Sequence, residues 1–311
     1  MLARIEGEGL LDAMASGVTD AMIRTALAAG RLVAVRYGVF LSADAWPDEP
    51  SAQHLVRAHA EMVANPGSVM SHESAAVAWG LPSPGFTPWH ESRVSLTLAR
   101  GMHGSRRSSA VQHVAELPPA AVTRDADGYQ ITSLARTATD LAAGQALPQA
   151  LVVMDAAGRL LIESYSSRSR REDFANPRYV RAVREAFAEA VGRRWRTQLL
   201  DAIARVEPCR ESPAESLTAG YLHLSGLPMP QFQARIVTRK GTFYPDCYWP
   251  ESNLIGECDG KLKYAGADAI VLEKEREQVL SEEGKRFVRW LGKEIMLRPH
   301  DVIARIARAL G

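Results

Sequence analysis

The pattern of apolar and polar positions near the start of the chain predicts a helix followed by a hairpin. Thr19 or Asp20 can cap a helix whose apolar positions recur at helical spacing, and Gly30 ends it. Two short apolar stretches follow around Gly38, where glycine can adopt backbone angles closed to other residues. A helix followed by a hairpin with a basic tip is typical of a winged helix, which we expect over residues 1–45.

The middle of the chain changes character twice. Helical and strand-like patterns alternate over residues 46–162, which predicts an α+β domain without an evident catalytic cluster. Residues 163–208 are polar and rich in arginine, and we expect a connector there that becomes helical. Within it, residues 168–196 contain nine arginines and four acidic residues. Such a stretch either contacts phosphates or forms a solvated helix face.

Residues 209–311 have the pattern of an α/β domain with its elements in the order αβββαβα. Ser212 precedes a helix that carries proline in its first turn and ends near Gly226. The three strands, helix, strand and final helix are then expected over residues 231–238, 241–249, 253–258, 267–283, 286–290 and 299–310.

Composition and charge narrow the class of protein. The chain has 311 residues, which suits two or three domains, and 46% of them are hydrophobic, enough for ordinary cores. A net charge of +1 indicates that the chain as a whole is not a polyanion-binding protein. The three cysteines lack metal-ligand spacing and are expected to be reduced thiols. The N-terminus does not resemble a secretory signal, and no apolar run reaches the ~18 residues of a membrane span. We therefore expect a soluble, cytoplasmic protein without membrane contact.

Acidic side chains gather at the ends of two neighbouring predicted strands. Asp246 lies in one strand and Glu257 at the end of the next, and a hairpin brings opposite positions to within ~5 Å. Asp259 is two residues beyond Glu257 and shares its face. Clustered carboxylates repel each other unless a cation neutralises them, and oxygen ligands suit Mg²⁺ or Mn²⁺. Such an ion activates water and stabilises charge on a phosphate, and Lys261 or Lys263 would steady the attacking water.

The alternative is a solvated strand end where acidic residues have accumulated by chance. One observation argues against this alternative. The apolar run 254–256 leads directly into Glu257, and burying an acid at the end of a strand costs free energy unless the acid has a partner or a function.

The motifs of residues 209–311 resemble, in their order, a bacterial domain family related to very-short-patch-repair endonucleases, within the PD-(D/E)XK superfamily. They are Ser212–Glu215, Tyr244–Asp246, Trp249–Glu251, Ile255–Gly260, Glu273–Arg276 and Arg286–Trp290. The resemblance implies a restriction-endonuclease-like fold and a DNA endonuclease that uses Mg²⁺ or Mn²⁺.

The same resemblance implies which acids do the chemistry. Asp246 matches the first strand acid, Glu257 and Asp259 match a Glu-x-Asp-Gly signature, and Glu215 matches the helix acid. The superfamily pattern places a lysine two residues after the second acid. If Glu257 is the second acid, that position holds Asp259 in place of a lysine. If Asp259 is the second acid, the lysine is Lys261, and both alternatives remain open. We take Asp246, Glu257 and Asp259 as candidate metal ligands, with Lys261 and Glu215 as catalytic partners.

The first 162 residues resemble winged-helix antitoxins of abortive-infection (type IV toxin–antitoxin) systems. The motifs that carry this resemblance are Gly30–Leu32, Arg36–Phe40, Ser71–Ala76 and Thr132–Ala142. The resemblance implies DNA contact through Arg24, Arg31 and Arg36.

Other candidates are weaker. Tyr264, just past the acids, is the aromatic side chain best placed to stack a base at a cleft rim, whereas Trp249 is expected to pack in the core. We expect His72 to cap a helix or pack locally, and Arg136 and Asp140 to form an ion pair one helical turn apart.

Two classes of function follow. The first is a Mg²⁺-dependent DNA endonuclease delivered to duplex DNA by the winged helix. The second is a catalytically inert DNA-binding regulator or antitoxin-like protein, which the missing Glu-x-Lys and the near-neutral charge favour. A protein partner, such as a toxin or a repair factor, is a further hypothesis.

Overall fold

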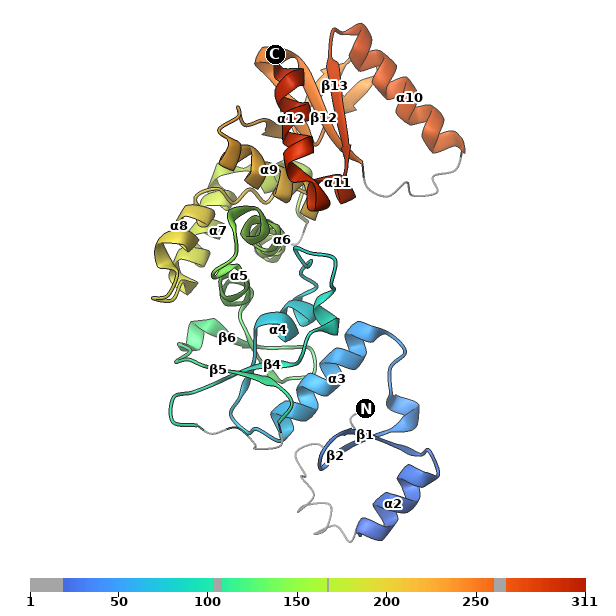
Figure 1. The fold of residues 1–311 in the computed structure, drawn as a ribbon, viewed down its shortest axis with the longest axis vertical. Helices are drawn as coiled ribbons and strands as arrows, with labels where there is room; N and C mark the ends of the chain where they lie inside the picture. The colour runs from blue at the N-terminus through green and yellow to red at the C-terminus, as the bar shows by residue number, and fades with distance from the viewer. Residues whose placement is uncertain (1–18, 103, 105–107, 167, 260–266) are drawn as a thin grey trace. The chain divides into compact units, whose positions relative to one another are not determined.

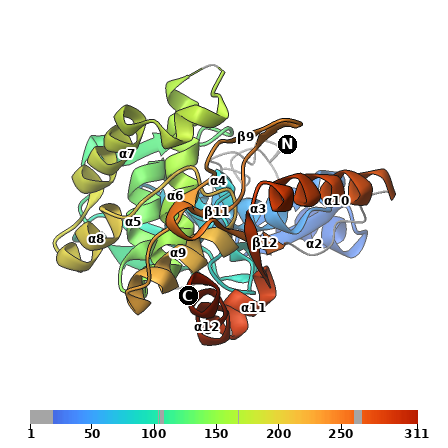
Figure 2. The same cartoon turned by 90° about the horizontal axis from the view of Figure 1, so that it is seen from above.

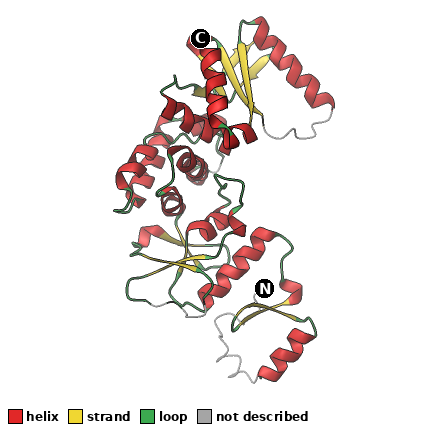
Figure 3. Ribbon diagram, viewed as in Figure 1, coloured by secondary structure: helices red, strands yellow, loops and turns green. Residues whose placement is uncertain are grey.

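The computed structural model describes residues 19–102, 104, 108–166, 168–259 and 267–311 (Figure 1). It divides into two compact units. Unit 1 comprises residues 1–81 and 87–141, and unit 2 comprises residues 82–86 and 142–311. Helices and strands occur in both units, and their larger sheets mix parallel and antiparallel neighbours (Figure 3). The fold is therefore mixed α/β, as the sequence predicted at this level.

Unit 1 begins with the expected helix and hairpin. Helix α2 (Asp20–Ala28) is capped by Thr19, whose Oγ1 accepts a hydrogen bond from the backbone N–H of Met22 at 3.2 Å. Strands β1 (Leu32–Arg36) and β2 (Val39–Ser42) pair as an antiparallel hairpin. Gly38 takes a φ of +79° in its turn, a conformation that L side chains rarely adopt.

The rest of unit 1 is a five-stranded sheet in the order β5-β4-β3-β7-β6, packed against helices. Its apolar core joins α3, α4 and the central strands through residues such as Ala58, Ala75, Met70, Leu96 and Ile131. The elements are η1 (Ala43–Ala45), α3 (Pro50–Val63), β3 (Val69–Met70), α4 (His72–Trp79), η2 (Trp89–Glu91), β4 (Ser95–Leu98), β5 (Val111–Val114), η3 (Pro119–Ala121), β6 (Val122–Arg124), β7 (Gln130–Thr132) and α5 (Leu134–Ala142).

Unit 2 opens with five helical segments. They are α6 (Leu147–Tyr165), η4 (Arg171–Ala175), α7 (Pro177–Ala190), α8 (Arg196–Ile203) and α9 (Pro213–Ser225). Of these, η4, α7 and α8 lie within the stretch where a connector that becomes helical was predicted. Val183 and Phe187 lie one turn apart on α7 and are fully buried. The side chain of Leu199 on α8 is only 2% exposed. Residues 163–208 are therefore largely a packed part of unit 2, because regularly spaced apolar positions lie among the arginines.

A buried ion pair holds α6 to the start of α9. The carboxylate of Asp155 on α6 accepts a hydrogen bond from Arg210 Nη1 at 2.8 Å. It also accepts from Ser216 Oγ on α9 at 2.7 Å and from the backbone N–H of Glu207 at 2.8 Å. The side chains of Asp155 and Arg210 are only 1% and 2% exposed. Three donors and one opposite charge thus compensate the burial of this carboxylate.

The C-terminal part of unit 2 is a mixed four-stranded sheet in the order β13-β12-β11-β8. β12 pairs in parallel with β13, β11 is antiparallel to β12 and β8, and α10 connects β12 to β13. Helices α10 and α12 lie on different sides of β12 (Figures 1 and 2). The elements are β8 (Gln231–Phe232), β9 (Ile236–Thr238), β10 (Gly241–Phe243), β11 (Cys247–Trp249), η5 (Pro250–Ser252), β12 (Leu254–Asp259), α10 (Ala267–Glu282), β13 (Arg286–Leu291), α11 (Gly292–Leu297) and α12 (Pro299–Leu310).

The predicted helices and strands occur in the predicted order, but α11 between β13 and α12 was not predicted, and two strand predictions were too long. The segments 231–238 and 241–249 are each split, and β9 pairs with β10 as a separate two-stranded hairpin. Gln233 has a φ of +51°, which breaks the first strand, and Pro245, which has no N–H to donate, precedes β11. Asp246 therefore lies just before a strand and not within one.

Among the residues that the structure describes, no helix combines the length and the apolar character that crossing a membrane requires.

Helices α6 and α9 approach so closely that Gly220 is expected to tolerate no side chain. A Cβ at this position would lie 2.4 Å from the backbone Cα of Pro148. We expect Gly220→Ala to lower the free energy of unfolding by about 1–3 kcal/mol, because the helices must move apart. Urea unfolding of the whole chain measures this. Gly192→Ala is the control, since no described atom lies within 4 Å of its added Cβ. Equal losses in the two variants would contradict the prediction.

Candidate functional site

The first acid of the site, Glu215, is fixed by the cap of α9. Ser212 Oγ accepts a hydrogen bond from the backbone N–H of Glu215 at 3.2 Å and donates to Glu215 Oε1 at 2.8 Å. The backbone N–H of Glu211 donates to Glu215 Oε2 at 3.1 Å. A serine cap with an acid three residues later holds both side chains in place. Glu215 is consequently almost fully buried, at 3% exposure.

The second acid, Asp246, faces β12. Cys247 pairs with Gly256, so that the continued antiparallel register places Asp246 opposite Glu257. Asp246 Oδ2 accepts a hydrogen bond from the backbone N–H of Cys258 at 2.8 Å. The sequence-based expectation that Asp246 and Glu257 meet across a hairpin is therefore confirmed, although Asp246 precedes its strand.

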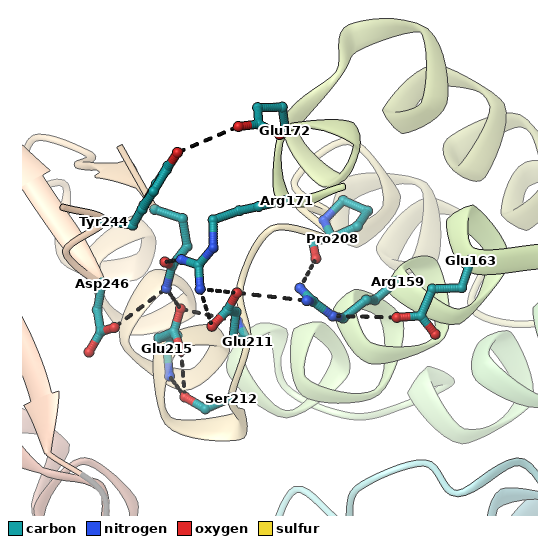
Figure 4. Close-up of polar contacts among 11 residues, drawn as sticks. Arg159, Glu163, Arg171, Glu172, Pro208, Glu211, Ser212, Glu215, Tyr244 and Asp246 are labelled. Carbon is teal, nitrogen blue, oxygen red and sulfur yellow. Dashed lines mark hydrogen bonds and ion pairs between the residues drawn. The ribbon is translucent and has the colours of Figure 1, made fainter. Parts of the chain in front are cut away.

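Gln233 joins Glu215 to Asp246, and the sequence did not single it out. Its Nε2 donates to Glu215 Oε2 at 3.0 Å and lies 3.4 Å from Asp246 Oδ1. Its Oε1 accepts from Arg171 Nη1 at 2.7 Å, which orients the amide nitrogen towards the acids. Figure 4 shows Arg171 and the acids Glu215 and Asp246 around this contact. Arg171 and Gln233 are 62 residues apart in the chain, and no local pattern signals their contact.

Glu257 and Asp259 follow each other on one face of β12, as predicted from their spacing. Glu257 Oε1 forms an ion pair with Arg276 Nη2 at 3.1 Å, a partner on α10 that the sequence did not reveal. The Asp259 charge contributes to the electrostatic field at Glu257. Lys261, Lys263 and Tyr264 lie outside the described residues.

Burial and nearby negative charge raise the pKa values of the acids in this cluster. Burial, and secondarily the charge of Asp246, raises the pKa of Glu215 to about 7. Burial and then Asp246 likewise raise the pKa of Glu257 to about 7. Burial raises the pKa of Asp246 as well, opposed by its hydrogen bond from Cys258. The charge of Asp246 therefore disfavours the ionised forms of both Glu215 and Glu257 in a poorly solvated site.

The donor chemistry of this site fits a divalent cation such as Mg²⁺ or Mn²⁺. The acids supply oxygen ligands, and a cation would relieve their repulsion. In the present side-chain arrangement, the described residues contain no group of three His, Cys, Asp or Glu side chains gathered closely enough to hold a metal ion. Arg276 donates to Glu257, and Gln233 donates to Glu215. Metal binding therefore requires the two glutamates to leave these partners and turn towards a common point.

Cysteines near the site remain thiols. Cys247 and Cys258 flank the acids on β11 and β12, and neither forms a disulfide. Burial raises the pKa of both thiols well above the ordinary value. Burial also raises the pKa of Cys209 to about 12. The thiolate form of these cysteines is therefore disfavoured.

The three arginines predicted to contact DNA are in different environments. Arg24 and Arg31 are exposed on α2 and just after it. Arg36 is 7% exposed, and its Nε lies 3.5 Å from Glu61 Oε1 on α3. Glu61 also accepts hydrogen bonds from Ser108 and Ser109. A contact between Arg36 and DNA would require the pair with Glu61 to open, whereas Arg24 and Arg31 need no such change.

Unit 1 holds a second group of ionisable side chains. The imidazole rings of His72 and His113 stack with centroids 3.5 Å apart. His72 begins α4 with a φ of +48° and packs locally, as the sequence suggested. Arg136 Nε and Asp140 Oδ2 are 2.8 Å apart, so the predicted ion pair is confirmed. Asp140 contributes to the electrostatic field at both histidines.

Comparison of the chain with models of known protein families finds no match, and a search among curated proteins finds no relative. The resemblances carried by the sequence motifs therefore stay predictions, and the function rests on the geometry.

The stacked histidines predict a stability that depends on pH. Burial lowers the pKa of His72 and His113 below the ordinary value of 6.5. The folded chain then binds fewer protons than the unfolded chain, so that stability is full above pH 6.5 and decreases as the pH falls below it. The raised pKa values of Glu215 and Glu257 act in the opposite direction over the same range, so the histidine contribution is measured as the difference in pH dependence between wild type and a histidine variant, by urea unfolding between about pH 7.5 and about pH 5.5. His113→Gln should reduce the pH dependence, whereas His300→Gln, at an exposed position, should not. Identical pH dependence in both variants would contradict this prediction.

The carboxyl cluster predicts that a neutral substitution stabilises the metal-free protein. We expect Glu257→Gln to raise the free energy of unfolding by about 1–3 kcal/mol at pH 8 in EDTA, because one of three repelling charges is removed. Glu251→Gln in the exposed turn is the matched control and should change little. A loss of stability in Glu257→Gln, measured by urea unfolding, would show that its ion pair with Arg276 outweighs the repulsion.

Proposed function

We propose that unit 2 is a divalent-metal-dependent phosphodiesterase that acts on nucleic acid, with DNA as the first substrate to test. One observation carries this proposal. Glu215, Asp246 and Glu257 come from α9, the entry to β11 and β12, and Gln233 and the paired strands join them. Glu215 is buried, and Asp246 and Glu257 are half-buried. Buried acids that repel each other are costly unless they serve a cation. The mixed sheet and the order of its elements support the expected restriction-endonuclease-like fold.

Each side chain has a defined task in this proposal. Asp246 and Glu257 hold the metal, with Asp259 as a further ligand. When bound, Mg²⁺ or Mn²⁺ supplies Lewis-acid stabilisation of charge on the phosphate and a more acidic water. The hydrogen bond from Cys258 N–H fixes one oxygen of Asp246. Glu215 orients the site through Gln233. Lys261, which steadies the attacking water in this hypothesis, lies outside the described residues.

The helix and hairpin of unit 1 are proposed to contact DNA. Arg24 and Arg31 support this role because they are exposed, and a guanidinium group donates readily to backbone phosphates.

The second candidate is a catalytically inert DNA-binding regulator or antitoxin-like protein, with a toxin as a further partner. The ion pair between Glu257 and Arg276 favours it, because a resident guanidinium can neutralise the acid in place of a metal ion. In that case the acids stabilise the sheet and take no part in chemistry.

Cleavage assays separate the two candidates. Labelled duplex, mismatched, branched and single-stranded DNA, together with RNA, would be incubated with wild-type protein in Mg²⁺, Mn²⁺ or EDTA. We expect metal-dependent cleavage that falls at least ~100-fold in Asp246→Asn, because the variant loses a charged metal ligand. Glu251→Gln, an exposed acid in the adjacent turn, should retain full activity. Duplex binding without cleavage under every metal condition would favour the regulator.

A further inference from the structure

A polar cleft of about 500 Å³ lies in unit 2, outside the carboxyl cluster. It opens between the C-terminal half of α6, the segment around η4 and the residue before the cap of α9 (Figure 4). Its lining contains two arginines, two glutamates, two serines and one aromatic ring, namely Arg159, Arg171, Glu163, Glu211, Ser166, Ser169 and Phe174.

Arg159 is positioned in this cleft but only loosely engaged. Its guanidinium group stacks on the ring of Phe174, 3.9 Å from the centroid. Its three polar contacts are long, at 3.8 Å to Glu163, 3.5 Å to the Pro208 carbonyl and 3.7 Å to Glu211. A charge-assisted hydrogen bond from guanidinium to an anion is normally 2.7–2.9 Å. The stacking therefore holds a cation whose donors can be satisfied better by an acceptor that enters the cleft.

Arg171 connects the cleft to the carboxyl cluster. Its Nη2 lies 3.1 Å from Glu211 at the cleft, and its Nη1 donates to Gln233 Oε1 at 2.7 Å. Gln233 in turn donates to Glu215. The guanidinium also lies 4.8 Å from the centre of the Tyr244 ring, which precedes Asp246 by two residues. One planar cation thus contacts both sites.

A hydroxyl group adds a further donor at the cleft. Ser169 Oγ is buried and has no hydrogen-bond partner among the described residues. Buried hydroxyl groups are nearly always hydrogen-bonded in proteins, so an unpaired one that lines a cleft points to a ligand acceptor.

We propose that this cleft binds a non-scissile phosphate of the nucleic-acid strand that is cut at the carboxyl cluster, with Arg159 and Arg171 as its cationic contacts. The proposal rests on the proposed function and names its substrate-positioning site. Two guanidinium groups and a hydroxyl match the acceptor oxygens of a phosphodiester. Arg171 belongs to the arginine-rich stretch of residues 168–196, whose excess of positive charge attracts a polyanion. Glu163 and Glu211 keep the cleft near neutrality until the strand binds.

Binding assays with the full chain test the cleft without cleavage. A fluorescent single-stranded oligonucleotide with phosphorothioate linkages would be titrated in EDTA at several salt concentrations. We expect Arg159→Gln to weaken binding about tenfold and to reduce the slope of log K against log salt by about 1. Glu163→Gln should tighten binding, because it removes a negative charge from the same cleft. Arg298→Gln, at a side chain that is 69% exposed, is the control and should change neither quantity.

The outcomes separate this inference from the proposed function. Unchanged affinity and salt slope in Arg159→Gln, with a wild-type unfolding midpoint, would overturn the cleft assignment even if the protein cleaves DNA. Arginine-dependent binding in EDTA, together with no cleavage in Mg²⁺ or Mn²⁺, would support strand binding at the cleft and contradict the phosphodiesterase. Inorganic phosphate and a mononucleotide serve as competitors at millimolar concentration. If they bind in an Arg159-dependent manner while the oligonucleotide does not, the cleft takes a free phosphate compound and the strand-binding proposal is wrong.

Discussion

Unit 2 depends on the buried ion pair between Asp155 and Arg210. Asp155 accepts hydrogen bonds from Arg210, Ser216 and the backbone of Glu207, and it thereby joins α6 to α9 and to the segment before it. Burial raises the pKa of Asp155, and the charge of Arg210 opposes that shift. A carboxylate taken out of water is tolerated only when its partners replace the lost solvation. The pair holds Arg210, two residues before the Ser212 cap of α9, against α6.

The start of α9 supplies acids to both sites of this unit. Glu211 faces the cleft and contacts Arg159 and Arg171, while Glu215 faces Gln233. The backbone N–H of Glu211 donates to the Glu215 carboxylate, so that the two acids are held by one cap. Arg171 contacts Glu211 and Gln233 at once through its two terminal nitrogens. The cleft and the carboxyl cluster are consequently parts of one polar arrangement.

Unit 1 also contains a buried carboxylate whose partners replace its lost solvation. Glu61 on α3 accepts hydrogen bonds from Ser108 and Ser109 and pairs with Arg36 at the end of β1. This pair ties the hairpin to α3. An arginine at a hairpin tip looks like a DNA contact in the sequence, but in the fold it compensates a buried glutamate. The exposed Arg24 on α2 and Arg31 just after it carry the DNA hypothesis instead.

The sequence by itself determined the features that depend on neighbouring residues. Thr19 capping, the turn at Gly38, the shared face of Glu257 and Asp259, and the order of elements in residues 209–311 follow from local periodicity and turn chemistry. Only the tertiary structure decided the features that join distant segments. Gln233 adopts a left-handed backbone conformation and contacts Arg171, 62 residues away in the chain. Arg276 pairs with Glu257, and Arg36 forms a buried ion pair with Glu61. These contacts depend on which surfaces pack together, and a charged side chain takes its partner from that packing, which no local spacing encodes.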